Sequence, residues 1–95
     1  DYIAALQRAE ATGAVDDGVR AMHQIGTLSN PVFPQIYSRP ATGAGGVLLA
    51  ARLTASGGVV HVPGGGTHHG RADRASGFCY VNDAVLGLLA WLNRF

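Results

Sequence analysis

The residues best suited to chemistry are two adjacent histidines, His68 and His69, which follow the glycines Gly64–Gly66. Imidazole titrates near neutral pH, so one ring of such a pair can accept a proton while the other donates one. Neighbouring side chains on a loop point in different directions, which makes the pair poorly spaced to bind one metal ion alone. Two solvent-exposed loop histidines are the plainer interpretation, and the doublet by itself favours it.

Glycine-rich loops often bind phosphate, but the glycines before the pair match neither of the two common phosphate-binding motifs. A Gly-x-Gly-x-x-Gly motif beginning at Gly64 would need a glycine where His69 stands. A Walker loop would need Gly-Lys, whereas Gly70 precedes Arg71. Phosphate binding is therefore disfavoured. The glycines are better explained by a chain that turns sharply or approaches another group closely.

The longer segment around the pair is more specific. It reads Gly-Gly-Thr-His-His over residues 65–69 and Ser-Gly-Phe-Cys-Tyr-Val-Asn-Asp over residues 76–83. This string resembles the active-site signature of histone deacetylases and of the related bacterial acetoin-utilisation and acetylpolyamine-type amidohydrolases. The resemblance runs without a gap from Gly65 to Leu89, and Asn30-Pro31 and Gly45-Gly46 upstream are also similar to the bacterial members.

The resemblance implies an α/β fold of the arginase–deacetylase type, a single domain around a parallel sheet of about eight strands. Residues 1–95 would be the N-terminal portion of that domain within a longer parent protein. The parent would be a zinc-dependent hydrolase that removes acetyl groups from acetyl-lysine or from acetylated polyamines, water attacking a metal-polarised carbonyl. The family's zinc ligands come downstream of this segment, so no metal ligand is expected here, and the chain alone is expected to be inactive.

The same resemblance assigns roles to individual residues. His69 is implied as the principal proton-transfer group, and His68 as the group that helps to position the water. The implied substrate-binding residues are Gly66, Gly77, Phe78 and Cys79. Of these, Gly66 lets the backbone approach the pocket, Gly77 and Phe78 line the tunnel for the acyl-lysine stem, and Cys79 lies beside the acetyl group.

One departure from the family pattern bears on the substrate. Ser29 stands where many members carry an acidic residue that holds the substrate backbone at the tunnel rim. A small acylated amine is therefore an alternative to a peptide substrate. Two other functions stay open, a truncated non-catalytic binding module and an arginase-like ureohydrolase.

The spacing of apolar residues predicts four helices and one strand around the reactive loop. The expected helices cover Tyr2–Ala11 with Gly13 as C-cap, a short segment around Asp16–His23, Ala44–Ala55, and Ala84–Asn93 behind an Asn82-Asp83 N-cap. Val59–Val62 is typical of a buried strand, and the loop Gly64–Ser76 follows it directly. The rest of the stretch from Val15 to Pro40 is predicted to be irregular. The last helix has apolar residues on more than one face and is expected to be buried on two sides.

Several residues near these elements have ordinary explanations. Outside the motif, Phe78 would be a core aromatic and Cys79 a small buried hydrophobe. His61 would belong to the core or the sheet, and His23 has no visible partner. Asp83 is explained by helix capping beside its asparagine neighbour.

Composition narrows the class of protein further. The formal charge is +1, with seven basic and six acidic residues and no basic cluster, which gives no electrostatic basis for binding nucleic acid or a membrane. A single cysteine cannot form an internal disulfide, which agrees with a reducing, cytoplasmic location. No apolar run reaches the roughly 18 residues that span a bilayer. The oligomeric state is not determined by the sequence.

Overall fold

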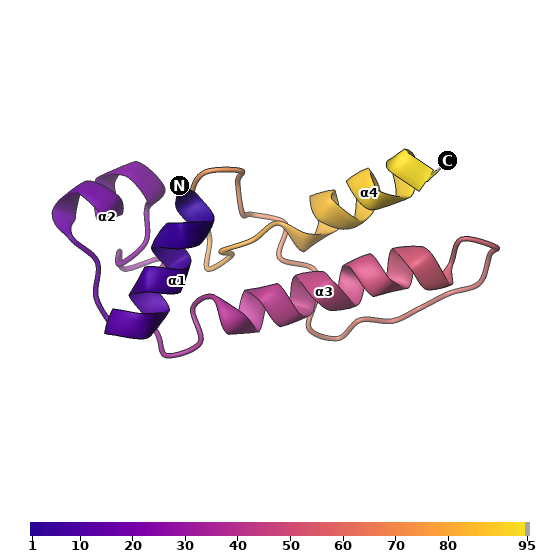
Figure 1. The fold of residues 1–95 in the computed structure, drawn as a ribbon, viewed down its shortest axis with the longest axis horizontal. Coiled ribbons are helices and arrows are strands. Elements are labelled where there is room, and N and C mark those ends of the chain that lie inside the picture. Colours follow the sequence, from indigo (N-terminus) through magenta and orange to yellow (C-terminus); the bar gives the residue numbers. More distant parts are fainter. Residues whose placement is uncertain (95) are drawn as a thin grey trace.

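The computed structural model describes residues 1–94, and it folds them into helices joined by long loops. The helices are α1 (Tyr2–Thr12), α2 (Asp17–His23), α3 (Ser38–Leu53) and α4 (Asp83–Arg94). Figure 1 shows α1 and α2 together at one end of the molecule, with α3 and α4 side by side toward the other. The molecule is elongated, measuring 46 × 21 × 20 Å.

Three helices begin where a side chain accepts a hydrogen bond from a free backbone N–H group. Asp1 accepts from Ala4 N at 2.8 Å, and Asp16 accepts from Val19 N at the same distance. Asn82 Oδ1 accepts from Val85 N at 2.9 Å, which makes it the N-cap of α4. Gly13 ends α1 in the left-handed region, φ 77°, as predicted. The predicted helices at Tyr2–Ala11, Asp16–His23 and Ala84–Asn93 are thus confirmed.

Helix α3 begins six residues before the predicted start at Ala44, so the region up to Pro40 is less irregular than expected. Its N-cap, Tyr37, makes no side-chain capping bond. Glu10 of α1 supplies the acceptor instead, since its Oε1 atom takes bonds from Ser38 N and Ser38 Oγ, both at 2.9 Å. Pro40 lies in the first turn, where a missing N–H removes no intrahelical bond.

The predicted buried strand at Val59–Val62 is wrong. Within residues 1–94 the structure contains no strand, only an isolated bridge between Ser76 and Cys79. Val59 is 96% exposed, Val60 is 40% exposed, and His61 is exposed rather than part of a core. A strand needs a neighbour to pair with, and the described residues supply none here. The parallel sheet of the α/β class therefore stays a prediction for the parent protein.

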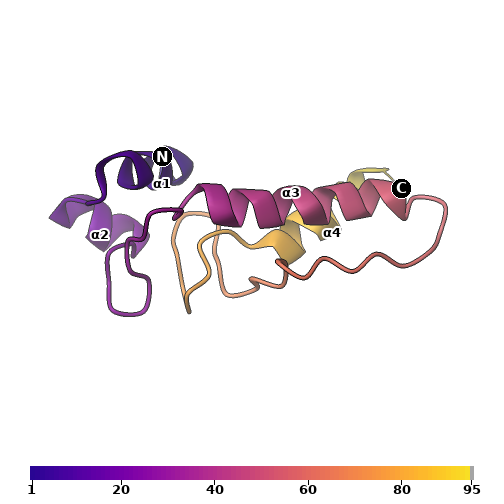
Figure 2. The ribbon, with the colours of Figure 1, turned by 90° about the horizontal axis from the view of Figure 1, so that it is seen from below.

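The chain after α3 turns back and runs along that helix toward the reactive loop (Figure 2). Glycines on α3 permit this close approach. A Cβ atom on Gly43 would lie 3.0 Å from Gly64 O, and one on Gly46 would lie 3.1 Å from Val62 Cγ1. The loop Gly64–Ser76 begins at this contact and is irregular, as predicted.

The buried core lies at the end of the molecule formed by α1 and α2. It joins these helices to the loops before α3 and before α4, and its buried members are Tyr2, Ala5, Leu6, Ala9, Ile25, Ile36, Ala75 and Tyr80. The Tyr2 hydroxyl donates to the carbonyl of Tyr80 across 78 residues of sequence. The N-terminal helix therefore helps to fix the segment that leads into α4.

Helix α4 packs against α3, with Gly87 facing Val47 so closely that no side chain fits between them. The predicted burial of α4 on two sides is wrong for this chain. Its leucines Leu88, Leu89 and Leu92 are exposed, because the described residues provide only α3 as a neighbour. No helix within residues 1–94 combines the length and the apolar character needed to cross a bilayer.

Candidate active site

The two histidines lie side by side on the loop that precedes α4. The ring centroids of His68 and His69 are 4.2 Å apart, and the ring planes meet at 38°. Both residues are exposed, and neither ring contacts a carboxylate among the described residues. The pair is therefore open to a reactant and free to exchange protons with it.

Gly66 orients the first of the two rings. Its carbonyl oxygen accepts from His68 N at 2.9 Å and lies 3.1 Å from His68 Nδ1. A carbonyl can only accept a hydrogen bond, so this contact is a hydrogen bond in the tautomer that carries its proton on Nδ1 and leaves Nε2 as an acceptor. The turn requires φ 96° at residue 66, a conformation that favours glycine.

Gly77 lies directly against the second ring. A Cβ atom at residue 77 would approach His69 Cγ to 3.0 Å and His69 Cδ2 to 3.2 Å. The structure thus brings together two residues predicted for the site from separate parts of the motif. The missing side chain makes room for the imidazole.

Gly77 and Phe78 form the tip of a tight turn between Ser76 and Cys79. Ser76 N donates to Cys79 O at 3.0 Å, and Cys79 N donates to Ser76 O at 2.8 Å. Both central residues have positive φ, 53° and 63°, as in a type I′ turn. Phe78 projects from this tip and is 65% exposed, so the alternative of a core aromatic is wrong. Cys79 is buried, as expected.

An apolar cavity of about 400 Å³ opens beside this turn. Phe78, Phe33 and Arg39 all line it. Tyr80 forms another wall and donates to Pro31 O at 2.5 Å, while burial raises the pKa of its hydroxyl to about 12. A cavity of this size and character is typical of a small-ligand site.

Asp83 has a role that the sequence did not predict. It is 2% exposed, and its carboxylate accepts from Gly66 N at 2.9 Å and from Thr67 Oγ1 at 2.7 Å. Capping of α4 falls to Asn82 alone. An Asn-Asp pair before a helix is explained by N-capping alone, so the sequence did not predict that Asp83 binds the loop.

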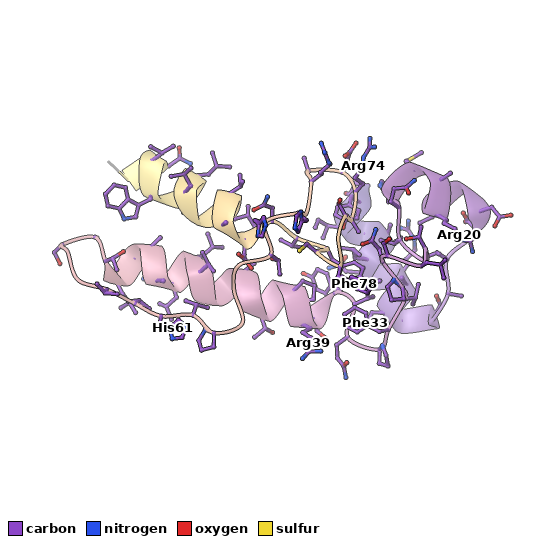
Figure 3. All side chains as sticks on the ribbon, turned by 180° about the vertical axis from the view of Figure 1, so that it is seen from behind. Arg20, Phe33, Arg39, His61, Arg74 and Phe78 are labelled. Carbon is purple, nitrogen blue, oxygen red and sulfur yellow. The ribbon has the colours of Figure 1, made fainter. Side chains whose placement is uncertain are left out.

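His23 also differs from its prediction, because it has partners. Its Nδ1 atom lies 2.6 Å from Asp73 O, and its carbonyl accepts from Ala75 N at 2.9 Å. These contacts join α2 to the second half of the loop. His61 lies beside α3, well away from Phe78, and belongs to no part of the site (Figure 3).

Within residues 1–94, no group of three or more His, Cys, Asp or Glu side chains is arranged to hold a metal ion. His68 and His69 provide two imidazoles, fewer than the three or four protein ligands of ordinary zinc sites. These residues alone do not form a zinc site.

Comparison with known proteins places these features in a family context. The family model described as "Histone deacetylase domain" matches residues 1–94. The chain is 38% identical over 90 residues to the acetoin utilization protein AcuC of Bacillus subtilis, covering 93% of this chain and 23% of that protein. It is 37% identical to histone deacetylase 8 of Xenopus laevis, covering 99% of this chain and 29% of that protein.

Solved structures give the same result for the fold. The chain superposes on the crystal structure of an HDAC homologue from Aquifex aeolicus with a TM-score of 0.90 and 34% identity. A crystal structure of an HDAC homologue complexed with SAHA matches with the same TM-score. Each match covers 99% of this chain and 25% of the solved one. The chain thus spans about a quarter of the length of these relatives.

Proposed function

The chain belongs to the histone deacetylase family, and on that premise we propose that its parent protein is a deacetylase, one that hydrolyses the amide bond of acetyl-lysine or of an acetylated polyamine. One observation supports this most directly. The two adjacent imidazoles lie on a glycine-rich loop, and His69 packs against Gly77 of the Ser76–Cys79 turn. This arrangement assembles a proton-transfer pair beside an exposed aromatic wall.

Amide hydrolysis needs a group that removes a proton from the attacking water and later returns one to the leaving amine. We assign that task to His69, whose ring is exposed and fixed on one face by Gly77. His68, protonated on Nδ1, keeps its Nε2 atom free to accept a hydrogen bond from the water. Two neighbouring rings can thus divide positioning and proton transfer between them.

Zinc is part of the proposal for the parent protein, with its ligands outside residues 1–95. When bound, the metal would polarise the acetyl carbonyl and the attacking water. The described side chains do not form a zinc site by themselves, so we assign neither histidine as a ligand. The contribution of this chain is confined to the proton-transfer pair and one side of the substrate pocket.

The substrate-binding side consists of the turn and the loop before it. Gly66 and Gly77 allow close approach of the backbone, Phe78 gives an apolar surface for an alkyl stem, and the next residue, Cys79, is buried. Ser29 carries no charge at the rim, which favours small acylated amines alongside peptides. An apolar wall with few polar groups suits the methylene stem of either substrate.

The test is an assay of the full-length parent protein on acetyl-lysine peptide and on acetylated polyamine. His69→Ala should lower kcat by about 100-fold or more, the usual contribution of a positioned general base. His61→Ala is the control, because this histidine lies away from the site, and the folded variant should keep the parent kcat. Metal content should stay equal in all three proteins.

Three outcomes would contradict the proposal. A fall in metal content proportional to the loss of activity would make His69 a ligand and not a proton-transfer group. Hydrolysis of a guanidine substrate in place of acetylated amines would support the ureohydrolase alternative, and no hydrolysis at all would support the binding module.

A further inference from the structure

We propose that Asn82 and Asp83, the two residues at the start of α4, are positioning residues that hold both active-site histidines in place. The inference rests on the proposed function and extends it to residues that contact the loop rather than the substrate. Their side chains bond to the backbone on both sides of the histidine pair.

Asp83 is a buried carboxylate that accepts hydrogen bonds from the loop. Its Oδ1 atom accepts from Gly66 N at 2.9 Å and from Thr67 N at 3.3 Å, and its Oδ2 atom accepts from Thr67 Oγ1 at 2.7 Å. A buried carboxylate without such partners would be strongly destabilising, so these bonds are obligatory. The loop is therefore fixed to the first turn of α4 immediately before the histidines.

Gly66 links Asp83 to His68, because its backbone contacts both side chains. The N–H group of Gly66 binds Asp83, and the carbonyl of the same residue faces His68 Nδ1 at 3.1 Å. With φ at 96°, Gly66 directs these two groups to different partners. Asp83 thus orients the carbonyl that faces His68 Nδ1 and favours a proton on that nitrogen.

Asn82 fixes the loop on the other side of the pair. Its Nδ2 atom donates to His68 O at 3.1 Å and to Gly70 O at 3.0 Å, so the backbone of His69 is held between two bonds from one amide. Its Oδ1 atom caps α4 through Val85 N. A Cβ atom at Gly70 would lie 2.9 Å from Asn82 N, which shows how closely the two segments approach.

Asn82 and Asp83 constrain the backbone on both sides of the histidine pair, and not only the start of α4. They bond to residues 66, 67, 68 and 70 and lie at the N-terminus of α4, which gives the loop a rigid base. Proton transfer requires the rings to lie within a narrow range of positions, and small displacements cost large factors in rate. Loss of either clamp should therefore reduce kcat with little effect on substrate affinity.

The test uses the full-length parent protein with two variants and a matched control. Asp83→Asn keeps the shape but removes the negative charge, and its amide nitrogen takes the place of one of the two oxygens that accept from Gly66 N and from Thr67 Oγ1. Asn82→Ser retains a good N-cap for α4 but removes the amide that reaches His68 O and Gly70 O. Asp73→Asn is the control, since it removes an exposed carboxylate of the same loop that lies 3.3 Å from Arg74 Nε.

Both variants should lower kcat by about 10- to 100-fold while KM stays within about 3-fold, and the control should match the parent. In ¹⁵N spectra of histidine-labelled protein, His68 should be protonated on Nδ1 in the parent and should lose that preference in Asp83→Asn. The His68 signal can be identified by its absence from a His68→Gln variant. If Asp83→Asn does not fold, Asn82→Ser alone decides.

The inference is overturned if Asn82→Ser folds and keeps the parent kcat, or if Asp83→Asn folds with unchanged kcat and an unchanged His68 tautomer. The spectra separate this result from a failure of the proposed function. They report the state of His68 whether or not the parent hydrolyses acetylated amines.

Discussion

The side-chain oxygen of Asn30 accepts a hydrogen bond at 3.0 Å from the backbone N–H of Phe78, 48 residues later in the chain. Asn30 is 4% exposed, and its amide nitrogen donates to Gln24 O at 3.0 Å. Phe78 has φ 63°, a left-handed conformation that costs a residue with a Cβ atom about 1 kcal/mol or more. The bond from Asn30 helps to hold the ring in this strained, exposed position.

Replacing Asn30 should separate substrate binding from stability. In the parent protein, Asn30→Ala removes the acceptor for Phe78 N and the donor to Gln24 O, so KM should rise several-fold. The free energy of unfolding should fall by about 2 kcal/mol, because buried polar groups are left unpaired. Asn30→Asp keeps an acceptor for Phe78 N and should lower stability with a smaller rise in KM. Equal KM values in the two variants would contradict a role for the bond to Phe78, and urea unfolding with steady-state kinetics measures both effects.

The packing of His69 on Gly77 predicts a second effect on turnover. In the parent, Gly77→Ala should lower kcat by about 10-fold or more, because the new methyl group would displace the His69 ring. Gly57→Ala is the matched control, since Gly57 also has positive φ, 103°, but nothing lies within 4 Å of its added Cβ atom. Both variants carry backbone strain, and only the first should alter the kinetics. Equal losses of kcat would mean that strain, and not the His69 contact, is responsible.

The helices could be predicted from sequence because their signals are local. Asp1, Asp16 and Asn82 are caps that act within three residues, and Gly13 ends α1 through its own backbone. The early start of α3 could not be found in this way. Its capping acceptor is Glu10, which is 28 residues away and reaches Ser38 only in the folded chain.

The sequence predicted which residues form the candidate site, but not the hydrogen bonds that hold them in place. The motif identified the histidine pair and the Gly77-Phe78 turn, and the structure brings His69 and Gly77 together. The supporting contacts from Asn30 and Asp83 join segments 48 and 17 residues apart, which no local pattern records. At Val59–Val62 the sequence predicted a strand that the structure lacks. A run of β-branched residues indicates that a segment can form a buried strand, but it does not indicate whether a partner strand is present.

The contact between Glu10 and α3 predicts a dependence of stability on pH. Hydrogen bonds from Ser38 N, Ser38 Oγ and Tyr37 N lower the pKa of Glu10 from its ordinary value of 4.5. A lowered pKa in the folded state adds stability that is present above the unfolded value and is lost as pH falls through the folded one. The Tm of the parent should therefore fall more steeply than that of Glu10→Gln between about pH 5 and pH 3. Parallel Tm curves in calorimetry would contradict this account of the α1–α3 contact.

The last prediction concerns the isolated 95-residue chain and follows from its exposed apolar surface. Val59, Leu53, Leu88 and Leu92 are all at least 58% exposed, and the core cluster lies at the α1–α2 end. Ordering each residue costs roughly 1–2 kcal/mol of conformational entropy, which burial must offset. A helix pair with leucines on its outer faces offers little of that burial and favours association with other chains.

We therefore expect the isolated chain to aggregate or to behave as a molten globule, with no sharp unfolding transition in calorimetry. The full-length parent protein is the control and should unfold cooperatively, because its remaining residues would cover α4 and the Val59–Val62 segment. Sedimentation at low concentration distinguishes aggregation from a monomeric molten state. A single cooperative calorimetric peak from a monomer of the isolated chain would contradict this expectation. Such a peak would mean that the chain is an independent domain, and the non-catalytic binding module would then become the better account of it.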